Sequence, residues 1–274
     1  MDAPIRFCET QTIAPGTHVV RQLYGEGVNP FAIHVNSMVI TGDEPMIVDC
    51  GPAVTRAGWL DHAFELVDPA DVRWVYLSHD DSDHTGNLRE VLDRCPRATL
   101  VTNWTSVERI GADYLLPLDR MRWVNDGESF TANGRRFVAV VPPTFDSPAT
   151  RGLFDTATGV YWAADSFATP VTHEVDDVAD LDPDFAREAF LQAQVGMSPW
   201  VRWVDEARYG AHLDRVRSLG ASVVASAHAI TLHGNQVDTA FGWLHALRDV
   251  VPLPTPDQSV LDAMVAMLEA AAAA

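Results

Sequence analysis

The stretch from Ser78 to Asn87 constrains this chain more than any other part of its sequence. It reads SHDDSDHTGN, and two histidines and three aspartates fall within six residues. Carboxylates this close repel one another unless a cation neutralises them. Imidazole and carboxylate are the side chains that bind divalent metals of intermediate hardness. The alternative is a solvated acidic loop in which Thr85 or Asn87 caps the next helix, but a cap needs only a single side-chain oxygen. We therefore predict that this stretch forms half of a metal site.

Three further side chains of the metal-binding type lie just past the ends of predicted strands. They are Asp146 after strand 135–141, Asp165 after strand 160–163, and His228 after strand 221–226. Each has an ordinary alternative when taken alone: an Asx turn for Asp146, a turn cap for Asp165 and a buried core histidine for His228. Ligands collect at the carboxyl ends of strands in α/β sheets, so their shared position predicts one site.

Apolar runs and turn signals predict an α/β fold with one large core. We expect strands at 17–24, 31–40, 46–49, 72–77, 98–102, 121–124, 128–131, 135–141, 152–155, 160–163 and 221–226. We expect helices at 53–67, from Leu88, and at 105–112, 183–195, 199–219 and 236–250. This order favours a mixed sheet with helices packed outside it. No linker divides the chain, so we predict a single domain over 1–274, with an amphipathic helix in 251–274 docked on it.

The formal charge, 19 basic minus 38 acidic residues, is −19. It argues against nucleic acid or an anionic membrane surface as a partner. The three cysteines, Cys8, Cys50 and Cys95, have no C-x-x-C spacing and indicate free thiols in a reducing compartment. Met1–Arg6 lacks the features of a signal peptide, and no apolar run is long enough to span a bilayer. We therefore expect a cytoplasmic protein.

Other catalytic templates are missing from the sequence. It has no Gly-x-Ser-x-Gly elbow, no glycine-rich phosphate loop and no dinucleotide fingerprint. We therefore expect no protein nucleophile. Several histidines and aromatic residues are candidates for the wall of a substrate pocket, although the aromatic ones fit a core better than a pocket. These are Tyr24, His34, Phe145, Phe167, His173 and His233.

With these residues in view, the chain resembles the metallo-β-lactamase superfamily. Asn36-Ser37-x-x-Ile40 with Asp49-x-Gly51 is similar to the opening hairpin of that family, and His79-x-Asp81-x-Asp83-His84 is similar to its His-x-His-x-Asp-His motif. Asp146, Asp165 and His228 fall where its later His, bridging Asp and final His are expected. The resemblance covers about 36–228 and implies an αββα sandwich of two mixed sheets, with a two-metal site at one edge.

Two positions depart from the usual motif, because Asp81 and Asp146 replace histidines. A carboxylate at the position of Asp81 resembles the flavodiiron proteins and their stand-alone oxygen-binding di-iron relatives, which have Glu there. The resemblance implies that Asp165 bridges two metals. It assigns His79, Asp81, Asp146 and Asp165 to one metal, and Asp83, His84, Asp165 and His228 to the other.

Carboxylates in place of imidazoles make the ligand set harder, which favours iron or manganese over zinc. The leading hypothesis is therefore a di-iron protein that binds and activates or reduces O2 or a related small oxidant. The chain ends soon after His228, so we expect no flavin site and electrons from the substrate or from an electron-donor protein. The alternative is a binuclear hydrolase of a small neutral or aromatic substrate, in which a bridging hydroxide attacks. A third hypothesis is metal binding without catalysis. The sequence leaves the oligomeric state open.

Overall fold

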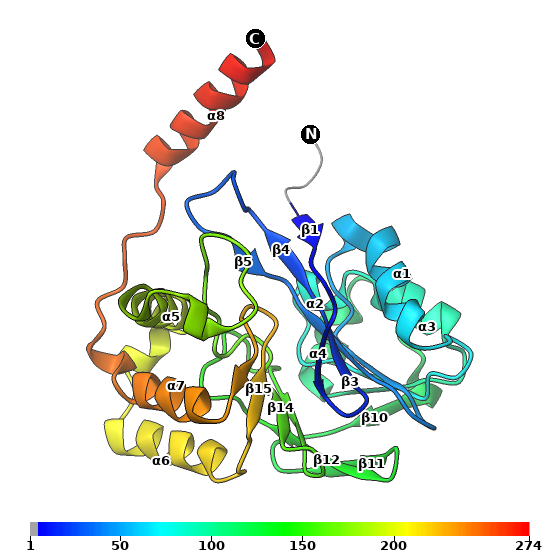
Figure 1. Ribbon diagram of the computed structural model, residues 1–274. Coiled ribbons are helices and arrows are strands. Elements are labelled where there is room, and N and C mark those ends of the chain that lie inside the picture. The colour runs from blue at the N-terminus through cyan, green and yellow to red at the C-terminus, as the bar shows by residue number, and fades with distance from the viewer. Residues whose placement is uncertain (1–4, 274) are drawn as a thin grey trace.

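The computed structural model describes residues 5–273, so part of the N-terminal segment used for the signal-peptide prediction lies outside the described residues. Two large mixed sheets lie face to face in the middle of the molecule, and helices cover the outer side of each (Figure 1). A small sheet of strands β1, β4 and β5 lies beside them. The predicted fold class, an α/β sandwich of two mixed sheets flanked by helices, is confirmed.

The first sheet has seven strands in the order β10-β9-β8-β7-β6-β3-β2. Its strands are β2 (Gln11–Ala14), β3 (Thr17–Val20), β6 (Ser37–Ile40), β7 (Met46–Val48), β8 (Trp74–Tyr76), β9 (Thr99–Thr102) and β10 (Met121–Trp123). The strands from β7 to β10 are parallel and the others are antiparallel. Its helices are η1 (Ala53–Thr55), α1 (Arg56–Leu66), α2 (Ser82–Thr85), α3 (Leu88–Arg94), α4 (Trp104–Ile110) and η2 (Leu118–Arg120).

The second sheet has six strands in the order β11-β12-β13-β14-β15-β16. These are β11 (Ser129–Ala132), β12 (Arg135–Val140), β13 (Gly152–Asp155), β14 (Val160–Trp162), β15 (Val223–Ala225) and β16 (Leu232–His233). The helices of this half are η3 (Val178–Asp180), α5 (Pro183–Met197), η4 (Pro199–Arg202), α6 (Glu206–Arg217), α7 (Asn235–His245) and η5 (Leu247–Asp249). The small sheet pairs β1 (Ile5–Phe7), β4 (Gln22–Tyr24) and β5 (Ile33–His34).

The alternation of side chains along each strand divides the interior into separate cores. Met46 and Val48 of β7 pack in the core between the two sheets, whereas Ile47 faces the core under α1 and α3. A third core holds the helices of the second half against their own sheet. Because successive side chains of a strand point to opposite faces, a strand covered on both sides is apolar throughout.

Three long elements predicted from the sequence are each divided in the structure. The predicted strand 31–40 becomes β5 in the small sheet and β6 in the seven-stranded sheet. The predicted strand 17–24 breaks at Arg21, where the chain passes from the seven-stranded sheet to the small sheet. The buried Arg21 guanidinium lies 2.6 Å from the Asp176 carboxylate, so its charge is paired. The predicted helix 199–219 divides before Asp205, whose side chain caps α6 by accepting from the Arg208 N–H.

Helix α8 (Gln258–Ala273) extends away from the body at the end of the segment 251–257 (Figure 1). The described side chains of this helix are exposed. The structure therefore differs from the prediction that this helix docks on the body of the same chain, although its amphipathic helical character is as expected. Among the described residues, no helix combines the length and apolarity needed to cross a membrane.

Candidate metal centre

The acidic motif lies at the carboxyl end of β8, in the loop that leads into α2. Asp81 immediately precedes this one-turn helix, and Asp83 and His84 lie within it. The His79 and His84 rings lie 4.0 Å apart between centroids. The short helix turns the chain so that side chains two to five residues apart converge. In an extended loop these side chains would point in alternating directions.

The structure brings all seven predicted ligand residues together. Three groups have candidate ligand atoms within 4.8 Å of one another. The first is His79, Asp81, Asp146 and Asp165, the second is Asp83, His84 and His228, and the third, His79, His84 and Asp165, links these two. Asp146, Asp165 and His228 come from loops that follow β12, β14 and β15 of the second sheet. The centre therefore lies where loops from both sheets meet.

Asp165 lies between the two groups, and each of its carboxylate oxygens faces one of them. Its Oδ2 atom is 3.3 Å from His79 Nε2, in the first group. Its Oδ1 atom is 2.9 Å from His84 Nε2 and 3.4 Å from His228 Nε2, in the second group. This is the arrangement in which one carboxylate can bind two cations at once.

The three histidines are oriented by hydrogen bonds at Nδ1. His228 Nδ1 lies 2.8 Å from the His34 carbonyl oxygen, and His84 Nδ1 lies 3.0 Å from Asp49 Oδ2. His79 Nδ1 lies 3.0 Å from Ser78 Oγ. The carbonyl and the carboxylate only accept, so His228 and His84 donate from Nδ1. The Nε2 lone pairs of these rings therefore face the centre, which is the orientation of a metal-binding histidine.

Asp49 is the buried carboxylate that supports this arrangement. Its Oδ1 accepts from the Ser78 N–H at 2.8 Å, and its Oδ2 accepts from Ser78 Oγ at 2.7 Å and Trp162 Nε1 at 2.9 Å. Because Ser78 Oγ donates its proton to Asp49, it accepts from His79 Nδ1. Asp49 thus orients His84 directly and His79 through Ser78.

The buried polar atoms of the centre fit a cation. Among the described residues, His79 Nε2, His84 Nε2 and Asp165 Oδ1 have no hydrogen-bond partner, although they lie close together. A buried polar atom without a partner costs about 1–3 kcal/mol. A divalent cation would bind these converging lone pairs, and the mixed N and O donors suit iron, manganese or zinc. The residues present therefore fit a metal.

The charges of the centre shift the pKa of its members strongly. Burial raises the pKa of the Asp165 carboxyl, but His84 and His79 outweigh it and hold this pKa well below its usual value. Burial lowers the pKa of His228, but Asp165 and Asp83 raise it to about 10. The pKa of Asp81 is raised by burial and by the neighbouring Asp146 carboxylate. Metal binding must displace the protons that these pairs share.

Arg109 connects the two halves of the centre, a role that the sequence analysis did not predict. Its Nη1 atom lies 3.2 Å from an Asp80 carboxylate oxygen and 2.9 Å from Ser147 Oγ. Asp80 precedes Asp81, and Ser147 follows Asp146. Arg109 therefore holds together the loops that carry Asp81 and Asp146, the two aspartates at positions where the usual motif has histidine.

The predicted pocket residues lie in different environments. His34 and Phe167 are fully buried, and Phe167 packs in the helical core of the second half. Phe145 is half-buried against Trp200, with ring centroids 4.7 Å apart. Tyr24, His173 and His233 are exposed. Only His34, through its carbonyl oxygen, has a hydrogen bond to a predicted ligand among these six, and the pocket itself stays a prediction.

Comparison with known proteins agrees with this fold. The family model described as "Metallo-beta-lactamase superfamily" matches residues 31–147, so this part of the chain is similar to that superfamily. Several similar proteins and solved structures carry the names of diflavin or flavodiiron proteins. The resemblance inferred from the motifs is therefore confirmed.

Two curated relatives illustrate the sequence similarity. The "Putative diflavin flavoprotein A 3" of Nostoc sp. is 25% identical over 153 residues, which are 55% of this chain and 27% of the relative. The "Anaerobic nitric oxide reductase flavorubredoxin" of Salmonella arizonae is 22% identical over 160 residues, 58% of this chain and 33% of the relative. The chain thus spans about a third or less of the length of these relatives.

Solved structures show the same fold. The flavodiiron protein from Giardia intestinalis superposes with a TM-score of 0.73 at 15% identity, over 89% of this chain and 60% of that one. The rubredoxin oxygen:oxidoreductase of Desulfovibrio gigas also gives 0.73, at 14% identity, over 89% of this chain and 63% of that one. The fold is therefore the one found in flavodiiron proteins.

Proposed function

We propose that this chain is a di-iron protein that binds and activates or reduces O2 or a related small oxidant. The observation that carries the proposal is the donor set of the centre, in which four aspartates converge with three histidines. Carboxylate-rich mixed donors favour iron or manganese over the softer sets of zinc enzymes. The names of two similar proteins support it, since one is a nitric oxide reductase and one is an oxygen oxidoreductase.

In this proposal one metal is held by His79, Asp81, Asp146 and Asp165, and the other by Asp83, His84, Asp165 and His228. Each set contains histidine nitrogen and carboxylate oxygen. The four carboxylates would balance the charge of two divalent cations. The loaded centre would then attract an anionic substrate only weakly, which disfavours a β-lactam or a phosphodiester.

The burial of the centre is uneven, and this supports a small substrate. The His79, His84 and Asp165 side chains are buried, whereas those of Asp81 and Asp83 are 44% and 34% exposed. A small molecule would approach from the side of these two aspartates. Bound iron would supply the redox chemistry, and the protein would hold the Nε2 atoms in place and exclude water from the buried side.

In this proposal, the electrons that reduce the small oxidant come from outside the metal centre. The thiols of Cys8, Cys50 and Cys95 are buried, and among the described residues no cysteine belongs to the groups that converge on the centre. We therefore propose an electron-donor protein as partner. The relatives named as flavoproteins and flavorubredoxin match larger proteins, of which this chain covers only a part.

Metal selection tests the proposal against the hydrolase alternative, which the superfamily match also supports. Cells that express the chain would be grown with iron and zinc supplied together, and the purified protein analysed for both elements. The proposal expects iron and a visible spectrum that changes on exposure to O2. A colourless protein that holds only zinc and hydrolyses an ester or ether panel without O2 uptake would support the hydrolase instead.

A further inference from the structure

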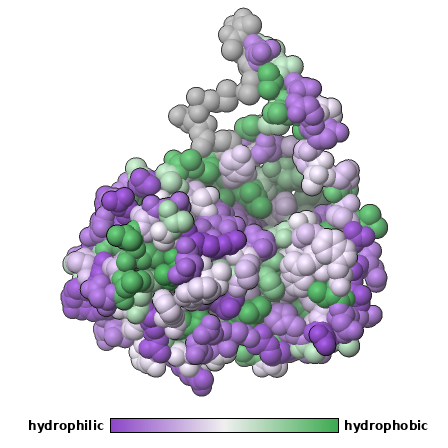
Figure 2. All heavy atoms as spheres, turned by 180° about the vertical axis from the view of Figure 1, so that it is seen from behind, coloured by the Kyte–Doolittle hydropathy of each residue, from purple (hydrophilic) through white to green (hydrophobic). Residues whose placement is uncertain are grey.

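Helix α8 presents an apolar face that covers nothing on its own chain. Val260, Leu261, Met264, Val265 and Met267 lie on one side of it and are exposed. Figure 2 shows hydrophobic side chains on this helix, which stands off the rest of the surface. A helix of this length is marginal in water, because most helical stability in proteins comes from packing an apolar face. The face therefore requires a partner surface.

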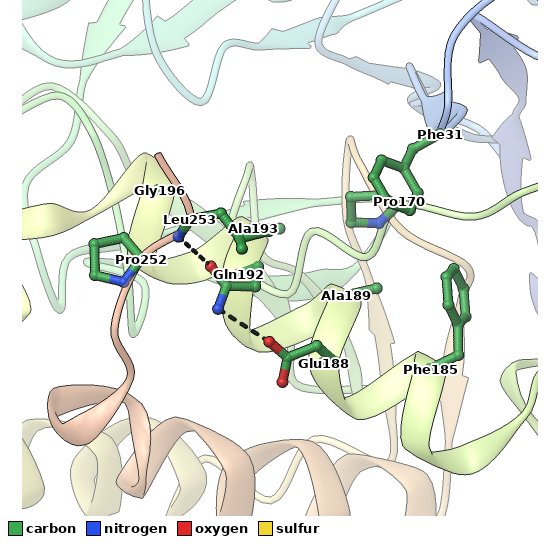
Figure 3. Close-up of a pocket in the computed structure, with 10 residues that line it drawn as sticks. All are labelled: Phe31, Pro170, Phe185, Glu188, Ala189, Gln192, Ala193, Gly196, Pro252 and Leu253. Carbon is green, nitrogen blue, oxygen red and sulfur yellow. Dashed lines mark hydrogen bonds between the residues drawn. The ribbon is translucent and has the colours of Figure 1, made fainter. Parts of the chain in front are cut away.

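An apolar groove on α5 has the shape and chemistry of such a surface. Its floor is a stripe of α5 residues spaced as one helical face, Phe185, Ala189, Ala193 and Gly196, and it encloses about 340 Å³. Phe31 and Pro170 form its far wall (Figure 3). The small side chains of α5 let a second helix approach closely, and the aromatic rings offer apolar contact.

The chain leading to α8 is anchored at the rim of this groove. The Leu253 N–H donates to Gln192 Oε1 at 2.8 Å, and Gln192 Nε2 donates to the Val251 carbonyl at 3.1 Å. Figure 3 shows Gln192 on α5 facing Leu253. The last anchored residue is therefore only a few positions before Gln258, where α8 begins.

The sequence of this linker keeps α8 from turning back into the groove of its own chain. Pro252, Pro254 and Pro256 alternate with Val251, Leu253 and Thr255. Proline fixes its own φ and biases the preceding residue toward extended backbone. The four residues 254–257, between the last anchored residue and α8, thus form a stiff arm of about 12 Å at about 3.1 Å per residue. A return would require a sharp bend within this arm.

We infer that α8 of one copy of this chain packs in the α5 groove of a second copy, in a reciprocal exchange. An anionic membrane is a poor alternative partner, because α8 has no Lys or Arg and carries Asp262 and Glu269. The exchange gives each apolar face one occupant and closes the assembly with two-fold symmetry. It adds an interface to the chain and is independent of the function proposed for the metal centre.

Crosslinking between two differently tagged full-length chains tests this exchange. One chain carries Ala193→Cys in the groove and the other carries Val265→Cys on α8. The natural cysteines are buried and will not compete for a short bismaleimide. The exchange predicts a covalent product that contains both tags. A third chain carries both substitutions. The inference would be overturned if the crosslink forms only within this chain and light scattering gives the mass of a single chain.

Matched charge variants provide the second arm of the test. Met264→Asp places a carboxylate on the apolar face, whereas Ala266→Asp places the same charge on the opposite face, which is also exposed. The exchange predicts that Met264→Asp weakens dimerisation by about tenfold or more, and that Ala266→Asp leaves it unchanged. Equal dimerisation of both variants would contradict the inference. A crosslinked product of two Met264→Cys chains, joined through their α8 helices, would also contradict it.

Discussion

His84 Nδ1 lies 3.0 Å from Oδ2 of Asp49, a carboxylate that is fully buried between the two sheets. This contact orients the His84 ring, and the same carboxylate orients His79 through Ser78. Trp162 of the second sheet donates to the same oxygen at 2.9 Å. The metal centre and the packing of the two sheets therefore depend on one side chain.

Asp49→Asn is expected to weaken metal binding by about 10–100-fold, the usual cost of losing a carboxylate behind a metal-binding histidine. The amide can no longer accept every donor that now surrounds Asp49. Competition with a chelator measures the effect. Asp155→Asn is the matched control, because Asp155 is also buried and accepts from Ala157 N–H at 2.9 Å and Thr158 Oγ1 at 2.8 Å, outside the centre. Equal metal affinity in both variants would contradict the role given to Asp49.

Single ligand variants should remove the two metals separately. Asp146→Ala is expected to lower the metal content by about half, and Asp83→Ala to do the same from the other group. Asp165→Asn is expected to lower both and to abolish turnover, because each of its oxygens faces one group. Elemental analysis measures the content, and circular dichroism checks the fold. If Asp165→Asn only lowers the melting temperature and the metal content is unchanged, the account of the centre is wrong.

Gly86→Ala is expected to destabilise the motif loop. A Cβ at this position would lie 2.2 Å from the Ala53 backbone nitrogen and 2.7 Å from the Pro52 carbonyl carbon. Backbone must move to make room, at a cost of about 1–3 kcal/mol or more. Chemical denaturation measures the change. Gly210→Ala in α6 is the control, since nothing lies within 4 Å of its Cβ, and it should stabilise the helix by about 0.5–1 kcal/mol. Similar effects at both positions would contradict the packing described.

The buried thiols should be inert at neutral pH and should limit stability at high pH. Burial raises the pKa of Cys95 to about 12 and that of Cys8 to about 11. Between pH 9 and these values the unfolded chain loses thiol protons that the folded chain keeps, so stability falls as the pH rises. Alkylation at pH 8 should require denaturant. Rapid alkylation of the native protein would show that these thiols are accessible.

The convergence of the candidate ligand residues could be predicted because each is a chemically distinct residue at the end of an apolar strand. His79, Asp165 and His228 fall at such ends, and sheet geometry then brings them together. The role of Asp49 could not be derived in this way, since it depends on Trp162, which is 113 residues distant in the chain. Local sequence carries no signal for a contact of that range.

The remaining differences in the fold have a similar cause. The run 17–24 has a continuous β pattern. Only Arg21, whose charge is paired with Asp176, marks the point where the chain passes from the seven-stranded sheet to the small sheet. The apolar face of α8 predicted that this helix docks on the body, but the face is exposed in the structure, because amphipathicity does not say which surface a helix will cover. In the proposed exchange, the prolines of the linker direct α8 away from its own chain.

Oxygen uptake by the reduced protein tests the central claim most directly. The iron-loaded chain would be reduced without air, and O2 consumption and the visible spectrum followed together on mixing, with Asp165→Asn as control. The proposed function predicts uptake of O2 with a change of the spectrum in the unsubstituted protein and neither in the variant. A fully iron-loaded, reduced protein that takes up no O2 or nitric oxide and keeps its spectrum would contradict it.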